Sequence, residues 1–230
     1  MKTFGRFLIL TAALLSIHSS AQIVTTYSSL GEPGDTYATG NGWLVNGSAN
    51  PPQPYVGETF AFTPTVSGRL SQVRVAIGAD QNLATDLANI LIAADGGRGL
   101  PGPTLESFLN VSCPGFFGAQ NPLVSLTSVV NPNLQAGGTY WICVMPALPT
   151  AAVTVNQNNQ GLQALQAQVF SSGWYARGNK TTFAFDVAVA VPEPSATAVL
   201  VAGLCLLLSP LARRSRTGRL LTDTGRFARR

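Results

Sequence analysis

Short stretches rich in β-branched and aromatic residues, separated by turn-forming residues, recur through the middle of the chain and constrain its fold most. Apolar and other residues alternate in Val73–Ile77 and Phe183–Val189, as in strands with one buried face. Segments such as Asn131-Pro132-Asn133 and Gly137-Gly138 supply turns between the stretches. Residues 22–190 contain no long stretch with clear helical periodicity. The pattern predicts an all-β domain, more closely a jelly-roll-like antiparallel β-sandwich.

The same pattern predicts the strands and the residues that face the core. The expected strands are Phe60–Thr65, Leu70–Ile77, Ile90–Ala94, Leu105–Val111, Val124–Val130, Thr139–Met145, Val153–Asn156, Ala167–Phe170 and Thr182–Val191, with a further one around Gly42–Val45. One short helical turn is expected at Ala84–Ala88. Residues two apart share a face of a strand, which predicts one core containing Val73, Val75, Ile77, Trp141, Cys143, Phe183 and Phe185. Arg74 and Asp186 have the opposite parity and are expected to be solvated.

The C-terminal part of the chain has a different character. Residues 196–212 form a run of 17 residues without charge, near the shortest length that crosses a bilayer. The segment from Arg213 to Arg230 holds seven arginines and one acidic residue, Asp223. By the positive-inside rule this end stays in the cytoplasm and the residues before the run are exported. A buried core helix followed by a basic tail is the alternative interpretation.

A short motif precedes this apolar run. The chain reads Val191-Pro192-Glu193-Pro194 before it, and Arg213, Arg214 and Arg216 follow it. A Pro-Glu-Pro motif, an apolar stretch and an arginine cluster in this order resemble the PEP-CTERM sorting signal of exported bacterial proteins. The resemblance implies a sorting signal over residues 191–230, with a transmembrane helix at 196–212 and an Arg-rich cytoplasmic tail.

That resemblance also implies a processing partner and a destination. An exosortase-type transpeptidase would recognise the Pro-Glu-Pro motif and remove the hydrophobic tail. The protein would be held in the membrane by the C-terminal helix before processing, and would then reach the cell surface or the extracellular matrix. Residues 56–190 are similar to choice-of-anchor β-sandwich domains, through segments such as Phe60–Pro64, Leu134–Trp141 and Ala184–Val187. Most such domains have no known activity, so this likeness implies a fold and a location outside the cell.

The N-terminal residues have the features of a secretory signal peptide. Lys2 and Arg6 form a basic start, Phe7–Ile17 is apolar, and Ser19-Ser20-Ala21 supplies the small residues that signal peptidase needs. We expect residues 1–21 to be removed before Gln22, which leaves residues 22–190 as the exported domain. A retained N-terminal anchor is the alternative, although the apolar run is short for one.

The charge of the chain is concentrated in these two ends. The whole chain has a formal charge of +4, but residues 22–195 hold five basic and nine acidic residues, a net charge of −4. The basic ends therefore give no support for nucleic-acid binding. The single histidine, His18, lies in the signal peptide, so the exported domain has no Ser-His or Cys-His relay and no imidazole ligand for zinc. No cofactor and no enzymatic activity are expected.

Two cysteines, Cys113 and Cys143, lie in the expected exported domain. In an exported protein such a pair is more often a disulfide than a redox or metal site. We therefore predict a Cys113–Cys143 disulfide, with two independent buried thiols as the alternative.

Several side chains are candidates for ligand contact. Trp43, Trp141, Trp174 and Tyr175 are aromatic residues of the kind that stack on sugars. Trp141 sits in a strong strand and is expected in the core, whereas Trp174 and Tyr175 follow a turn and are the better candidates for glycan contact. Carboxylates that are candidates for calcium are Asp80, Asp86 and Asp95. With Glu58 and Glu106 they also supply candidates for a glycosidase pair, although the sequence singles out no two of them.

These observations lead to one expectation and two alternatives. The leading one is a non-enzymatic exported protein that reaches the bacterial cell surface or extracellular matrix. Its expected partners are signal peptidase, an exosortase-type enzyme and the membrane. The first alternative is a carbohydrate-binding module for extracellular polysaccharide, and the more distant one is a secreted hydrolase.

Overall fold

Every regular element that the structure describes is a β-strand. The computed structural model describes residues 21–32, 36–50 and 54–192, and these contain fourteen strands and no helix. One compact unit spans Gln22–Val191. All strand pairs whose register is defined are antiparallel. The predicted all-β class is confirmed.

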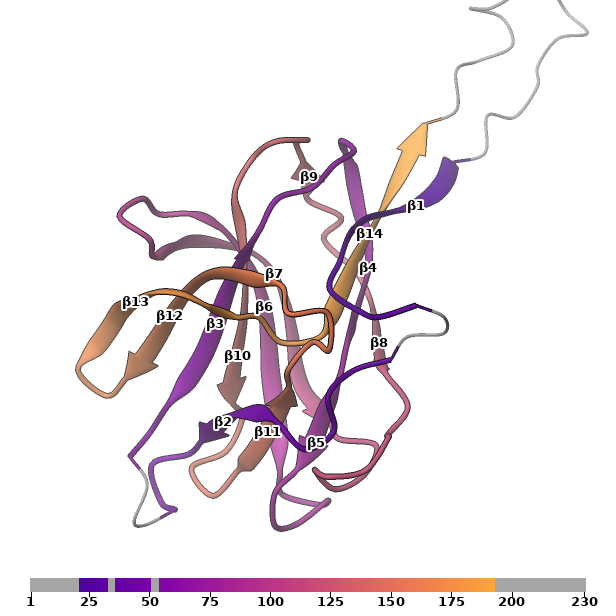
Figure 1. The fold of residues 1–230 in the computed structure, drawn as a ribbon. Coiled ribbons are helices and arrows are strands. Elements are labelled where there is room, and N and C mark those ends of the chain that lie inside the picture. Colours follow the sequence, from indigo (N-terminus) through magenta and orange to yellow (C-terminus); the bar gives the residue numbers. More distant parts are fainter. Residues whose placement is uncertain (1–20, 33–35, 51–53, 193–230) are drawn as a thin grey trace, which may run out of the picture. The chain divides into compact units, whose positions relative to one another are not determined.

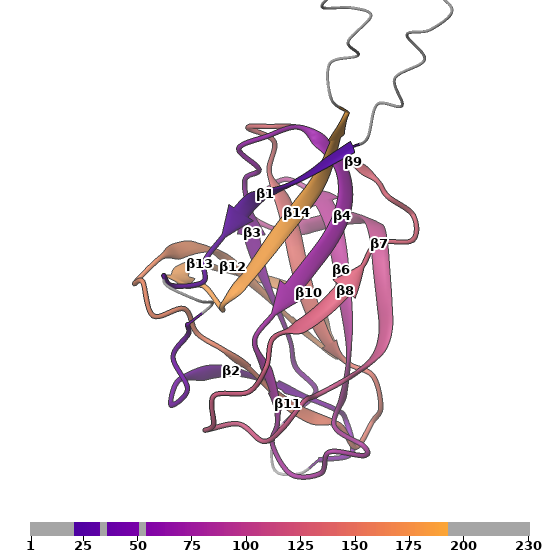
Figure 2. The same ribbon diagram turned by 90° about the vertical axis from the view of Figure 1, so that its right-hand side faces the viewer.

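The strands form three sheets (Figures 1 and 2). The six-stranded sheet has the order β13 (Gly173–Thr181), β12 (Gln163–Phe170), β3 (Gly57–Phe62), β10 (Tyr140–Pro146), β6 (Leu87–Asp95) and β7 (Pro101–Ser112). The five-stranded sheet has the order β1 (Ala21–Ser28), β14 (Phe185–Pro192), β4 (Gly68–Val75) and β8 (Val124–Thr127), and β9 (Asn133–Leu134) also pairs with β4. The three-stranded sheet has the order β2 (Gly42–Asn46), β11 (Ala152–Asn156) and β5 (Ile77–Ala79).

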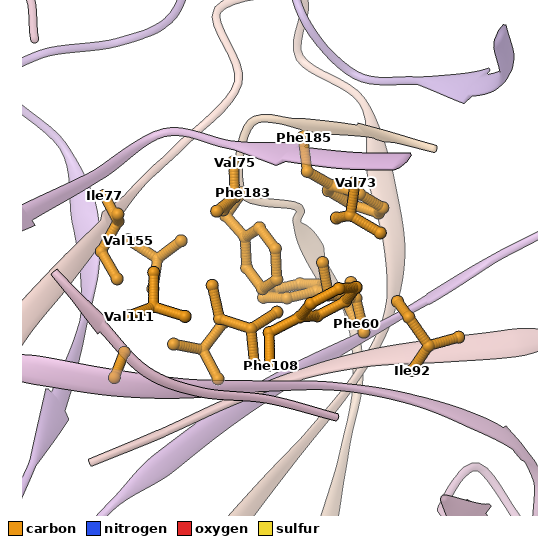
Figure 3. Close-up of a cluster of buried hydrophobic side chains, with 14 of the residues drawn as sticks. Phe60, Val73, Val75, Ile77, Ile92, Phe108, Val111, Val155, Phe183 and Phe185 are labelled. Carbon is orange, nitrogen blue, oxygen red and sulfur yellow. The ribbon is translucent and has the colours of Figure 1, made fainter. Parts of the chain in front are cut away.

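The main core lies between the six-stranded sheet on one side and the two smaller sheets on the other (Figure 3). Three buried phenylalanines form its centre: Phe183 packs against Phe60 and Phe185 with ring centroids 5.2 and 5.1 Å apart. Valines and isoleucines from all three sheets surround these rings. Burying such side chains contributes about 1.5–3 kcal/mol each, so this cluster supplies most of the driving force for folding.

Strand alternation places the predicted core residues of β4, β5 and β14 as expected. Val73, Val75 and Ile77 are buried in the main core. Phe183 and Phe185 join them there, and Phe185 lies opposite Val75 in the register of β14 on β4. The period-two pattern of the sequence was therefore a correct guide to these strands.

The prediction was wrong for β10. Trp141 and Cys143 belong to a second cluster, together with Ala61, Ala93 and Ala167, whereas Ile142 and Val144 face the main core. We call this second cluster the outer cluster, because it lies on the face of the six-stranded sheet that points away from the main core. β10 has strands on both sides and apolar residues at successive positions. Parity therefore could not tell which of its faces meets which cluster.

The expected solvation of Asp186 was also wrong. Asp186 is only 3 % exposed and lies opposite Arg74 in the register of β14 on β4. The Arg74 side chain is partly exposed and forms an ion pair with this carboxylate. Asp186 is buried because its charge is matched by a guanidinium on the neighbouring strand.

Four strands were not predicted. Leu70–Ile77 was expected as one strand, but β4 ends at Val75 and β5 begins at Ile77 in another sheet. β1 lies outside the expected strands and pairs with β14 at the edge of its sheet. β13 is an edge strand with mostly exposed residues, and β9 is only two residues long. Edge strands bury little, so their sequences lack a strong apolar alternation. The expected helical turn at Ala84–Ala88 is a non-helical turn followed by the start of β6.

The structure describes only the beginning of the predicted sorting signal. Val191 and Pro192 are the last residues of β14. Several predicted features lie outside the described residues: most of the signal peptide, Glu193, Pro194, the apolar run 196–212, and Arg213, Arg214 and Arg216. Within the described part of the chain, no helix has the length and hydropathy needed to cross a membrane.

Candidate functional site

The two predicted glycan contacts lie next to each other on β13 but point to opposite faces of the sheet. Trp174 lies opposite Val169 and packs against the outer cluster. Tyr175 lies opposite Gln168, is 47 % exposed, and packs against Phe170 with ring centroids 5.7 Å apart. The two rings therefore do not form one stacking platform. Tyr175 alone presents an exposed aromatic side chain on this hairpin.

Tyr175 begins a row of side chains that crosses three neighbouring strands. Gln168 of β12 is directly opposite Tyr175 of β13, and Glu58 of β3 is directly opposite Gln168. Directly opposite residues in an antiparallel pair project to the same face of the sheet. The next residue in the row is Val144, which belongs to the main core. The row therefore runs from an exposed edge into the protein interior.

Glu58 is the buried polar end of this row. Its side chain is 2 % exposed. Gln166 Nε2 donates a hydrogen bond of 2.8 Å to one carboxylate oxygen, and Gln168 Nε2 donates one of 2.5 Å to the other. Burial raises the pKa of Glu58 to about 7, because the hydrogen bonds from the two glutamines and the charge of Arg177 only partly offset the loss of hydration. This carboxyl group therefore titrates near neutral pH.

Arg177 lies beside the row because β13 contains a bulge. Ala176 is opposite Ala167, and Gly178 is opposite Gln166, which leaves Arg177 without a residue opposite it. Gly178 has a φ of 72°, a left-handed conformation that favours glycine. Bulges redirect side chains, and here the exposed guanidinium is close enough to Glu58 for its charge to lower the carboxyl pKa. We call Tyr175, Gln168, Glu58 and Arg177 the hairpin face.

The other buried carboxylates hold the fold together. Asp86 accepts backbone hydrogen bonds from Gln81, Asn82 and Ala152 and so fixes the turn before β6. Asp186 is paired with Arg74. Among these three carboxylates of the described residues, Glu58 alone is held by side-chain amides. Local backbone structure therefore explains its burial least.

Glu106 is a further carboxylate with a structural role. It accepts hydrogen bonds from Ser128 Oγ at 2.5 Å and from the backbone N–H groups of Val129 and Val130 at 3.0 and 2.8 Å. Burial alone would raise the pKa of Glu106, but these hydrogen bonds outweigh it, so the pKa lies below its ordinary value. Glu106 therefore fixes the loop between β8 and β9.

The described acidic residues do not gather into a calcium site, and Glu58 and Glu106 lie too far apart to act as a glycosidase pair. Asp95 accepts a hydrogen bond from Trp141 Nε1 at 3.0 Å, and the described residues hold no group of three or more side chains placed to bind a metal ion. Glu58 and Glu106 lie on β3 and β7, which are separated by β10 and β6. Three strand spacings amount to about 14 Å, which exceeds the carboxylate separations of roughly 5–9.5 Å in glycosidases.

The predicted disulfide is absent from the described structure. Cys113 and Cys143 are both free and buried. Cys113 lies in the main core, whereas Cys143 lies in the outer cluster, where its Sγ is 3.1 Å from Thr59 Oγ1. The six-stranded sheet separates the two thiols, because Cys143 points away from the main core. Burial raises the pKa of each to about 12, so neither is a reactive thiolate near neutral pH.

The remaining two tryptophans have structural roles. Trp141 is fully buried in the outer cluster. Trp43 packs against Phe60 with ring centroids 5.8 Å apart, and its Nε1 donates a hydrogen bond of 2.9 Å to the carbonyl oxygen of Thr181. Trp43 therefore ties β2 to the end of β13, next to the hairpin face.

Two hollows of the described surface lie away from the hairpin face. A hollow of about 300 Å³ lies at the other end of β12, lined by residues that include Tyr27, Phe62 and Ala164. A second hollow of about 370 Å³ lies along β7, beside Glu106 and Val130. Small molecules favour enclosed pockets, so an exposed aromatic ring beside amide and guanidinium groups is better suited to an extended chain.

The functional argument rests on the sequence and on the geometry described above. No protein-family model matches the chain, and no curated protein sequence matches it. The sequence had pointed to Trp174 and Tyr175 but not to Glu58, Gln168 or Arg177 as one group. The Gln-Ala-Gln alternation at residues 166–168 is the signal that hinted at two amides on one face of a strand.

Proposed function

We propose that this protein is a non-enzymatic exported protein that is sorted to the bacterial cell surface or the extracellular matrix. The observation that carries the proposal is the position of the compact β unit, Gln22–Val191. It lies between an N-terminal segment with signal-peptide features and a C-terminal segment that resembles a PEP-CTERM signal. Sorting requires an exosortase-type transpeptidase, with signal peptidase acting at the other end.

The two strands next to the expected processing points belong to the same sheet. β1 contains Gln22, the expected first residue of the mature chain, and β14 contains Val191 and Pro192 of the Val-Pro-Glu-Pro motif. β1 and β14 are neighbours in one sheet, and their outer ends lie at the same end of the body (Figure 1).

The finer fold assignment is a jelly-roll-like β-sandwich. It is supported by the arrangement of the six-stranded sheet across the main core from the five-stranded sheet. Such sandwiches serve many functions, so the fold itself adds nothing to the functional argument.

Intact-mass analysis of surface material from the native host tests the sorting proposal. We expect a mature chain that begins at Gln22 and ends near the Pro-Glu-Pro motif. Replacing both Pro192 and Pro194 by alanine should retain the precursor in the membrane, whereas replacing Pro132, which lies in a turn region of the body, should not. A mature surface form that still contains Arg213–Arg230 would overturn the processing proposal.

Binding of extracellular polysaccharide is a second candidate function. It is favoured by one specific observation, the exposed Tyr175 ring beside Gln168 and Arg177. A glycan array probed with the purified protein tests it, and Tyr175→Ala should abolish saturable binding. Trp174→Ala is not the right probe, because Trp174 packs against the outer cluster. Unchanged binding in Tyr175→Ala would rule out this surface.

A further inference from the structure

We propose that the hairpin face recognises an acidic polysaccharide, with Arg177 binding carboxylate groups of the ligand and Tyr175 stacking on a sugar ring. This inference rests on the second candidate function and names the chemical class of its ligand. It follows from the distribution of charge, the free guanidinium and the order of side chains along the row.

The acidic net charge of the body is largely hidden from its surface. Four carboxylates are buried, namely Glu58, Asp86, Glu106 and Asp186. The exposed acidic residues of the described chain are Glu32, Asp80 and Asp95, and the exposed basic residues are Arg69, Arg98, Arg177 and Lys180. The described surface is therefore not acidic, and it does not repel a polyanion as the net charge of −4 would suggest.

Two of these exposed basic residues, Arg177 and Lys180, are on β13 itself. A third, Arg98, lies in the turn between β6 and β7, whose Gly99 approaches Ala176. Ala176 is opposite Ala167 of the outer cluster, so this turn lies by the other face of β13. A polyanion that follows the hairpin face along β13 therefore meets the charges of Arg177 and Lys180.

The guanidinium of Arg177 is available to a ligand. Within the described residues no hydrogen bond or ion pair holds it, in contrast to Arg74, which is paired with Asp186. A guanidinium presents a planar fork of N–H donors that matches a carboxylate in a bidentate arrangement. Arg177 therefore offers the group that distinguishes a uronic acid from a neutral sugar.

Tyr175 and Gln168 supply the contacts that any sugar needs. The partly exposed Tyr175 ring offers a flat apolar surface, and Gln168 lies directly opposite it. Tyr175 and Arg177 are two residues apart on a strand, about 7 Å along the chain. A ligand ring stacked on Tyr175 therefore has Arg177 within reach of its own or a neighbouring carboxylate.

Glu58 acts on Arg177 only through its charge, and it is not expected to touch the ligand because it is buried. The strands packed against it, β2, β10 and β12, carry no charged side chain, and Arg177 is the charged group that acts on it. When ionised, Glu58 attracts the same guanidinium that the ligand needs. Its titration near neutral pH predicts weaker binding of acidic ligands as the pH rises through 7.

Calorimetric titration of the full chain, purified in a mild detergent, tests the inference with polygalacturonate as the acidic probe and dextran as the neutral one. We expect binding of polygalacturonate at pH 6, with at least a tenfold loss of affinity in Arg177→Gln. The matched control Arg69→Gln removes an exposed arginine on β4 and should leave affinity unchanged. Glu58→Gln should bind equally well at pH 6 and pH 8, whereas the unmodified protein should bind more weakly at pH 8.

The possible outcomes distinguish failure of the acidic-ligand proposal from failure of the polysaccharide-binding proposal on which it rests. Binding of dextran that is lost in Tyr175→Ala but unaffected by Arg177→Gln would overturn the acidic ligand and leave polysaccharide binding in place. An equal loss in Arg69→Gln and Arg177→Gln would reduce the effect to general charge attraction and overturn the assigned site. Failure to bind either probe or any member of a glycan array would overturn both proposals.

Discussion

Arg74 and Asp186 face each other on β4 and β14, and the Nε of Arg74 donates hydrogen bonds of 3.1 and 2.9 Å to the two carboxylate oxygens of Asp186. Because Asp186 is buried, removing its partner leaves a carboxylate without compensation. We expect Arg74→Ala to lower the free energy of unfolding by about 2–3 kcal/mol. Urea denaturation at pH 7 measures this loss. Arg69→Ala, an exposed neighbour on the same strand, should change it by less than about 0.5 kcal/mol; equal effects would show that the ion pair contributes little.

The phenylalanine cluster supports a second prediction. Phe185 is fully buried and packs against Phe62 and Phe183. Phe185→Ala removes buried area and leaves a cavity, so we expect a loss of about 3–5 kcal/mol in the free energy of unfolding. The matched aromatic control is Tyr175→Ala, which removes a half-exposed ring on an edge strand and should cost about 1 kcal/mol or less. Thermal and chemical denaturation of the two variants compare them directly, and similar losses would contradict the placement of the core.

The raised pKa of Glu58 predicts that the free energy of unfolding decreases as the pH rises. Burial raises its folded-state pKa from the ordinary value of 4.5 to about 7, so the folded state holds a proton that the unfolded state releases near pH 4.5. Protonation of Glu58 therefore stabilises the folded state fully below about pH 4.5. This stabilisation is lost as the pH rises through 7, by about 3 kcal/mol at most. Urea denaturation at pH 5 and pH 8 measures it. The decrease should disappear in Glu58→Gln, and a decrease of the same size in that variant would assign the effect to another group.

The lowered pKa of Glu106 predicts the opposite dependence of stability on pH. Its hydrogen bonds to Ser128, Val129 and Val130 hold the folded-state pKa below the ordinary value. Its contribution is therefore present above the unfolded pKa and is lost as the pH falls through the lower folded pKa. Comparison of Glu106→Gln with the unmodified protein in acid denaturation measures this. The variant should lose part of the acid dependence, and an unchanged acid profile would count against the described loop anchor.

The cysteines provide a chemical test of the corrected pairing. Cys113 and Cys143 are free and buried, on opposite sides of the six-stranded sheet. We expect both to react with a thiol reagent only after unfolding, and dithiothreitol to leave stability unchanged. Peptide mapping without reduction identifies each thiol separately from Cys205. A recovered Cys113–Cys143 bridge would contradict the described register of β10.

Strands that bury one face were readable from the sequence, because their side chains alternate. β4 and β14 are the clearest cases, with Val73, Val75 and Phe185 placed as predicted. β10 was misplaced because both of its faces are apolar, so alternation could not choose between them. β1 and β13 were missed because edge strands bury too little to impose a pattern.

The hairpin face was less accessible to sequence reasoning than the strands. Tyr175 was a candidate because an aromatic residue followed a turn, but its partners come from a different part of the chain. Gln168 and Glu58 are 110 residues apart in sequence, and only the register of β12 on β3 brings them together. The disulfide prediction failed for the same reason, since pairing depends on which face of a central strand a cysteine occupies.

The pairing of the first strand with the last also affects when the fold can close. Ser29, just after β1, bonds to Phe185 across 156 residues of sequence, and β14 lies between β1 and β4 in the sheet. Contacts of such long range form slowly, because the loop between them must close first. A chain that is synthesised from its N-terminus therefore contains β1 long before its sheet neighbour β14. The five-stranded sheet is completed only when residues 185–192 are available, so the fold closes late in synthesis.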